Sequence, residues 1–131
     1  GFLMITISLT AILLICLAHY IADFVFQTDW MAQNKSKNNY PLFIHVCTYS
    51  AILFVILLPI ASSSDLIVFA LLNGILHFII DFFTSRLSSK LYREGKLGSS
   101  TIPNFGFFSV IGLDHLLHYI CLFTTFGIFL A

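Results

Sequence analysis

The sequence has 131 residues, of which 59% are hydrophobic and only 9% are charged. A soluble domain carries about 25% charged residues, so this chain has too few to cover a surface that faces water. Its six basic and six acidic residues cancel, which excludes the basic field that attracts nucleic acid. The 15 phenylalanines and five tyrosines exclude a disordered chain. An integral membrane protein of a few helices remains.

Hydropathy predicts an all-α, four-helix membrane bundle that forms a single domain over residues 1–131. Each of four apolar stretches is close to the ~20 residues that cross the hydrocarbon of a bilayer. The stretches cover about 2–26, 41–60, 66–85 and 105–130. Beyond the third stretch the pattern predicts a short amphipathic extension that ends at Gly95. Asn104 is the expected cap of the fourth helix.

All six basic residues lie in two of the three predicted connections. The connection over residues 61–65 has no Lys or Arg. Because positively charged connections stay in the cytoplasm, both termini are expected on the non-cytoplasmic side. The first connection has Lys35 and Lys37, and the third has Arg86, Lys90, Arg93 and Lys96.

Ionisable side chains occur inside the predicted spans, in pairs spaced four residues apart. Side chains with this spacing share one face of a helix. Such groups are costly in a membrane and typically mark a functional interior. The pairs are His19 with Asp23, His77 with Asp81, and Asp114 with His118, and the second span adds His45.

Three further polar residues extend the same faces: Gln27, Tyr49 and Asn73. Lipid tails cannot satisfy these groups, so the four polar stripes are expected to face one another. Since the helices alternate in direction, all four stripes are expected in the cytoplasmic half of the bundle.

The three aspartates have no Lys or Arg within the spans, which favours a divalent cation as their partner. Imidazole with carboxylate is the ligand mixture typical of zinc, manganese or iron. The predicted ligands exceed those of one tetrahedral ion, so either two ions bind or some aspartates orient a histidine. The aspartates are also the candidate catalytic bases. The seven predicted ligands are His19, Asp23, His45, His77, Asp81, Asp114 and His118.

Other uses of the same residues remain open: interhelical hydrogen bonds, a proton path, or axial histidines of a haem. Among functions, a metal-dependent hydrolase that acts from the cytoplasmic leaflet on a lipid or lipid-linked substrate is the first hypothesis. The alternatives are a transporter or channel for divalent cations or protons, and a non-catalytic membrane scaffold or phage accessory protein. Membrane lipids are the expected partners, with a homo-oligomer left open; nucleic acid is not an expected partner.

The longest motif begins at His19 and Asp23, continues through Gln27-Thr28-Asp29-Trp30, and ends at Asn34-Lys35. This motif resembles a domain-of-unknown-function family of small bacterial and phage four-helix membrane proteins. The resemblance implies a multi-pass protein of the bacterial inner membrane and supplies no activity. A looser similarity, of residue type only, links the chain to membrane-bound metal-dependent hydrolases. The other motifs that fit the family are Pro41-Leu42-x-x-His45, His77-Phe78-x-x-Asp81 and Gly112-Leu113-Asp114-His115-x-x-His118.

Overall fold

The computed structural model describes residues 6–98 and 101–131, which form helices and connecting loops with no strand. The predicted all-α class is confirmed. The elements in chain order are α1 (Leu9–Tyr20), the π-helical turn η1 (Ile21–Val25), α2 (Asp29–Asn34), α3 (Asn39–Leu57), the 3-10 turn η2 (Leu58–Ile60), α4 (Ser63–Arg93) and α5 (Phe107–Phe129).

Three of the helices are long and apolar enough to cross a membrane: 39–60, α4 and α5. In α5 only 11% of the most apolar stretch is buried within the protein, so its hydrophobic side chains face outward, where lipid tails can cover them. The first predicted span is helical only over Leu9–Val25, which is shorter than the others. The start of that predicted span, residues 2–5, lies outside the described residues.

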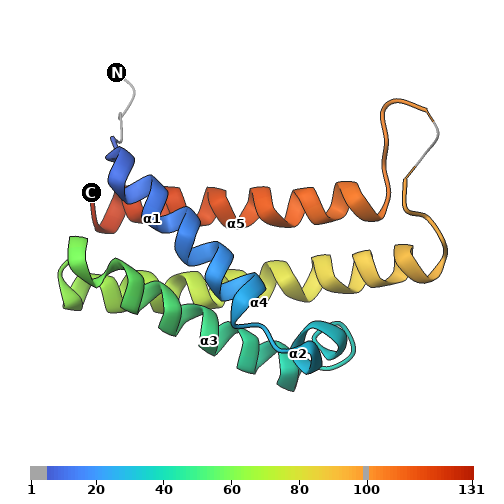
Figure 1. The fold of residues 1–131 in the computed structure, drawn as a ribbon, viewed down its shortest axis with the longest axis horizontal. Helices are drawn as coiled ribbons and strands as arrows, with labels where there is room; N and C mark the ends of the chain where they lie inside the picture. Colours follow the sequence, from blue (N-terminus) through green and yellow to red (C-terminus); the bar gives the residue numbers. More distant parts are fainter. Residues whose placement is uncertain (1–5, 99–100) are drawn as a thin grey trace.

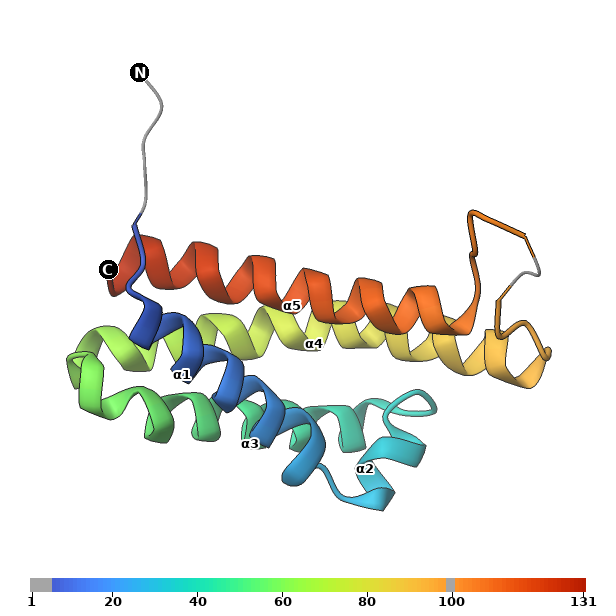
Figure 2. The same ribbon diagram turned by 45° about the horizontal axis from the view of Figure 1, so that its top comes forward.

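The long helices lie side by side, and α1 crosses them obliquely (Figures 1 and 2). Helix α4 packs between α3 and α5, and α1 packs mainly against α3. The start of α1, the α3–α4 turn and the end of α5 share one end of the bundle, whereas α2 and the α4–α5 loop extend toward the other (Figure 1). Lys35 and Lys37 lie between α2 and α3, whereas Arg86, Lys90 and Arg93 lie in the last turns of α4 and not in a connection. The lysines and arginines therefore lie toward the same end.

Apolar side chains fill the half of the bundle nearer the chain termini. Ala11, Ala18 and Ala22 are buried on α1 and its π-turn, and such small residues allow helices to approach closely in a membrane. They contact a core from the other three long helices, so the interior at this end is closed by packed hydrocarbon. The fully buried core residues include Ile15, Leu53, Leu57, Leu66, Phe69 and Leu122.

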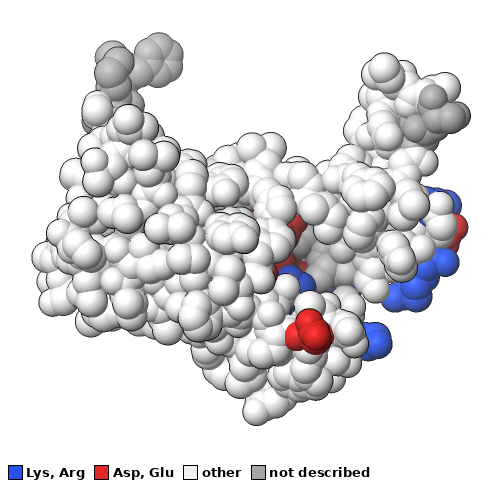
Figure 3. Space-filling view, in the orientation of Figure 1, with Lys and Arg blue, Asp and Glu red and all other residues white. Residues whose placement is uncertain are grey.

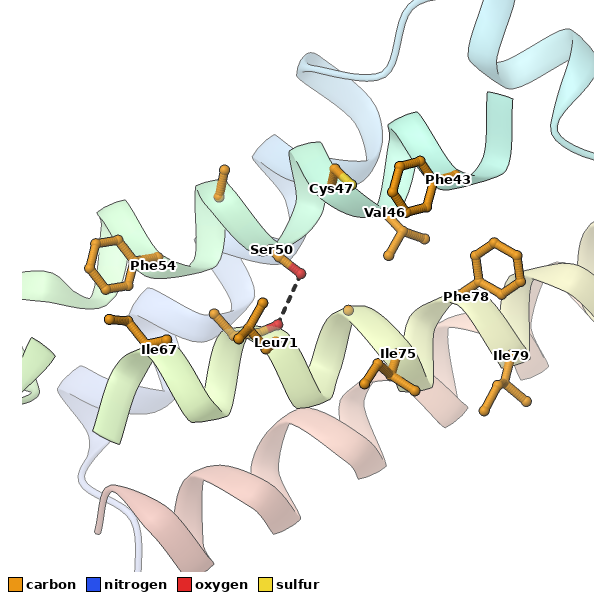
Figure 4. Close-up of a pocket in the computed structure, with 13 residues that line it drawn as sticks. Phe43, Val46, Cys47, Ser50, Phe54, Ile67, Leu71, Ile75, Phe78 and Ile79 are labelled. Atoms are coloured by element: carbon orange, nitrogen blue, oxygen red, sulfur yellow. Dashed lines mark hydrogen bonds between the residues drawn. The ribbon is translucent and has the colours of Figure 1, made fainter. Parts of the chain in front are cut away.

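A second apolar surface lies between α3 and α4, on the side turned away from α1 and α5 (Figure 4). Here the Ser50 hydroxyl donates a hydrogen bond to the Ala70 carbonyl oxygen at 2.9 Å. Gly74 allows this approach, because a Cβ at that position would collide with the Ser50 hydroxyl. The helices open on either side of this contact into a groove of about 720 Å³, lined by apolar side chains such as Phe43, Phe54 and Ile67.

Helix ends differ from the predicted ones by a few residues, apart from the end of α4. Helix α4 ends at Arg93 and Gly95 follows with φ +72°, which confirms the predicted stop, since glycine adopts this left-handed conformation without strain. Helix α5 begins at Phe107, so the prediction that Asn104 caps it is wrong. Instead the Gly106 amide donates to the Ser109 hydroxyl at 2.7 Å.

Candidate metal centre

Two buried histidines from neighbouring helices meet at the middle of the polar half of the bundle. The Nε2 atoms of His45 on α3 and His77 on α4 lie 3.2 Å apart. Asp23 lies in the π-turn, and its Oδ1 is 3.1 Å from His45 Nε2 and 3.4 Å from His77 Nε2. All three residues are buried. Three chain segments far apart in sequence thus direct ligand atoms at one point.

Asp81 approaches the same histidines from α4. Its Oδ2 lies 3.5 Å from His45 Nε2 and 3.4 Å from His77 Nε2. Its other oxygen, Oδ1, lies 3.6 Å from Nε2 of His118 on α5. The side chain is only 3% exposed. Asp81 therefore contacts histidines on both neighbouring helices.

His118 links this group to the third predicted aspartate. Its Nε2 lies 3.1 Å from Asp114 Oδ1, and its ring stacks on His77 with centroids 3.8 Å apart. The Thr84 hydroxyl donates to Asp114 Oδ1 at 2.6 Å. Asp114 is the most exposed of the three aspartates, with 18% of its side chain accessible, so it marks the rim of the cluster.

His19 reaches the cluster through a carboxylate. Its Nε2 lies 3.0 Å from Asp23 Oδ2, the oxygen turned away from the other histidines. A histidine in this position orients a ligand. The structure thus brings six of the seven predicted ligands together. They form three overlapping groups with ligand atoms within 4.8 Å of one another: Asp23, His77 and His118; His45, His77 and Asp81; and Asp81, Asp114 and His118.

The other polar residues singled out in the sequence lie around the cluster or away from it. The Tyr49 ring contacts the His77 ring, with centroids 4.0 Å apart. Asn73 donates instead to the Phe69 carbonyl and to the Thr125 hydroxyl, nearer the apolar core. Gln27 has a buried Oε1 with no hydrogen-bond partner among the described residues.

A lysine enters the cluster, which overturns the expectation that the aspartates have no basic partner. Lys35 follows α2, and its ammonium donates to Asp81 Oδ2 at 3.0 Å, with 19% of the side chain exposed. Burial alone would lower the pKa of Lys35, but the neighbouring Asp81 carboxylate raises that pKa above its ordinary value. The lysine is therefore charged at neutral pH.

From the sequence, Lys35 is expected in a connection, where its charge orients the bundle, and no contact with an aspartate is expected for it. Thr84 is not among the predicted site residues, although its position three residues after Asp81 puts it on nearly the same face of α4. The threonine could have been found from this spacing. The lysine could not, because 46 residues separate it from Asp81 and only the folded connection brings it near. The Asn34-Lys35 end of the first motif was its one signal.

The space-filling view shows acidic and basic side chains at the bottom of a hollow surrounded by uncharged surface (Figure 3). Elsewhere on this face the charged side chains gather on α2 and near the α4–α5 loop. The hollow gives the polar cluster an opening toward the end of the bundle where these connections lie.

Several cluster atoms converge without hydrogen bonds of normal geometry. Asp23 Oδ1 and the Nε2 atoms of His19 and His118 are buried and have no hydrogen-bond partner among the described residues. Buried polar groups are normally paired. Asp23 Oδ1 and His118 Nε2 face the cluster without such pairing, which fits metal ligands better than it fits a hydrogen-bond network.

The distances fit as well. Two ligands that each lie 2.0–2.1 Å from a tetrahedral zinc ion are about 3.3–3.4 Å apart. The distances between the Nε2 atoms of His45 and His77, and from each of them to Asp23 Oδ1 and to Asp81 Oδ2, are 3.1–3.5 Å. Each triangle of these atoms thus has the size of one face of such a site.

Comparisons with known proteins show a family for this chain but assign no activity. No curated protein and no solved structure matches the chain. A family model described as "Protein of unknown function (DUF3307)" matches residues 9–130. The match covers every helix, α1 to α5, and all the residues of the polar cluster. The chain therefore belongs to the DUF3307 family.

Proposed function

We propose that the protein is a membrane-embedded metal-binding protein whose ion serves the hydrolysis of a lipid or lipid-linked substrate. One observation carries this proposal: the Nε2 atoms of His45 and His77 lie 3.2 Å apart, and carboxylate oxygens of Asp23 and Asp81 lie within 3.5 Å of both. Mixed imidazole and carboxylate ligands suit zinc, manganese or iron.

The charge of the cluster supports one divalent ion at this point. The three aspartates contribute three negative charges and Lys35 contributes one positive charge, which leaves two negative charges when the histidines are neutral. Uncompensated charge of this size is costly in a membrane interior. A single divalent cation neutralises it.

A bound ion of this kind lowers the pKa of water toward ~7 and supplies hydroxide for hydrolysis. A proton released there has acceptors nearby in Asp23, Asp81 and Asp114. The hollow above the cluster gives a substrate access, whereas transport would require a polar path through the other half of the bundle. That half is filled by the apolar core with Ile15, Leu53 and Phe69, which favours hydrolysis over conduction.

Purified protein is expected to contain at least one equivalent of zinc, manganese or iron per chain, and to recover it after chelation. Elemental analysis measures the content. His45→Ala should lower it more than tenfold, whereas His115→Ala, outside the three ligand groups, should leave it unchanged. Metal at background level in the wild type, with no uptake on reconstitution, would contradict metal binding. Uptake of divalent ions into the lumen of liposomes that contain the protein would favour the transporter instead.

We further propose four spans in the bacterial inner membrane, with both termini on the non-cytoplasmic side. The support is the gathering of the basic connections toward one end of the bundle (Figure 1). After replacement of Cys16, Cys47 and Cys121, a single cysteine at position 63 should react with a membrane-impermeant maleimide added outside. A cysteine at position 37 should not react. The reverse labelling pattern would overturn this orientation.

A further inference from the structure

Asp81 directs its two oxygens at two different sets of ligands. Oδ2 faces His45 and His77, the pair at the centre of the proposed metal site. Oδ1 faces His118 at 3.6 Å. A carboxylate that presents one oxygen to each of two ligand sets has the arrangement needed to bridge two ions.

The second set of ligands consists of Asp81, Asp114 and His118, whose ligand atoms lie within 4.8 Å of one another. His118 is 2% exposed, and its Nε2 has no hydrogen-bond partner among the described residues, although it faces both aspartates. The Thr84 hydroxyl, 2.6 Å from Asp114 Oδ1, holds that carboxylate in place. An unpaired buried nitrogen thus points into a carboxylate pair outside the central histidine pair.

The net charge of a site with two ions indicates which group binds together with them. One divalent ion neutralises the cluster, so a second leaves two positive charges. A phosphate monoester carries about −1.5 to −2 at neutral pH and would offset them. In two-metal hydrolases, ions about 3.5–4 Å apart stabilise both the attacking and the leaving oxygen of a phosphoryl group. The Lys35 ammonium donates to Asp81 Oδ2. When metal ions bind that carboxylate, the ammonium can donate to a phosphate oxygen instead.

We infer that a second divalent ion binds to Asp81, Asp114 and His118 together with a phosphate group, so that the substrate class is a phosphate monoester. This inference rests on the proposed function. In the reaction, the oxygen of water forms a bond to phosphorus and the bond from phosphorus to the ester oxygen breaks. One proton of the water passes to the leaving oxygen, and the products are an alcohol and inorganic phosphate.

Titration of the full chain with Mn²⁺ tests the inference in maltoside micelles, which contain no phosphate. We expect one equivalent in the micelles alone, and two when inorganic phosphate or phosphatidic acid is added. Electron paramagnetic resonance should then show exchange coupling between the two ions. The phosphate source that acts at the lower concentration identifies a soluble or a lipid substrate.

Asp114→Asn should keep the first equivalent and lose the second, whereas Asp29→Asn, which changes an exposed aspartate of α2, should keep both. The retained first equivalent shows that the variant is folded. One equivalent in every arm of the wild-type experiment overturns the second site and leaves the proposed function standing. No bound Mn²⁺ in any arm contradicts the proposed function itself. A second equivalent that appears equally without phosphate overturns the assignment of the substrate class.

Discussion

Replacing Asp81 with asparagine is expected to lower metal affinity more than 100-fold while the helices stay inserted in the membrane. Asparagine keeps the volume and one carbonyl oxygen, but it removes the charge that a divalent ion requires. The loss should exceed the 10–100-fold cost of removing an outer-shell partner of a ligand, because both oxygens of Asp81 face histidine nitrogens. Competition with a chelating dye measures the affinity.

The matched control is Asp65→Asn, the same chemical change at an exposed position at the far end of α4. Its metal affinity should equal that of the wild type. If the cluster is only a set of interhelical hydrogen bonds, Asp81→Asn should leave the metal content unchanged. Its cost would then be about 1 kcal/mol or less, the size of such contacts in membranes. That result would remove the hydrolase proposal as well, and thermal unfolding in detergent separates the two outcomes.

Replacing Lys35 with methionine is expected to raise the affinity for a single divalent ion at least tenfold. The ammonium and the ion compete for Asp81 Oδ2, and the Lys35 side chain is mostly buried, so water screens this competition only in part. Methionine keeps the apolar stem and removes the charge, which leaves the three carboxylates without a basic partner. Tenfold in affinity corresponds to about 1.4 kcal/mol.

Two controls define this effect. Lys37→Met changes an exposed lysine of the same connection and should leave the affinity unchanged, while Lys35→Arg keeps the charge and should stay close to the wild type. Phosphate should reverse the sign: Lys35→Met is expected to weaken the phosphate-dependent second equivalent of Mn²⁺. A Lys35→Met protein that binds the first ion less tightly than the wild type would show that the lysine supports the site rather than competing for it.

The four-residue spacing of His with Asp was enough to predict which faces of the helices meet. His77 with Asp81, and Asp114 with His118, share a face in any regular helix, and burial of these faces follows from the cost of exposing them to lipid. The same reasoning does not distinguish a residue that binds the metal from a residue that orients a metal ligand. From the sequence, His19 and Asp23 are equal candidates for a metal ligand. In the structure only Asp23 contacts the central histidines, His45 and His77.

The failures have physical causes in the chain between α1 and α3. Hydropathy counts apolar residues and does not detect a change of helix type, so it predicts one continuous span through Phe26. The structure instead has a π-turn at Ile21–Val25, followed by the short helix α2. The approach of Lys35 to Asp81 depends on this path, and no local pattern encodes it.

The π-turn has a further consequence for the chain that follows it. The Phe26 amide donates to the Ile21 carbonyl, five residues back, so the turn accommodates one residue more than an α-helical turn. Each residue rotates an α-helix by about 100°. A chain without the exposed Val25 would close an ordinary turn, retain Asp23 beside His19, and carry Lys35 to another side of the bundle. The extra residue of the π-turn thus sets the direction in which the chain carries the Lys35 ammonium. It does so without changing the positions of the proposed metal ligands.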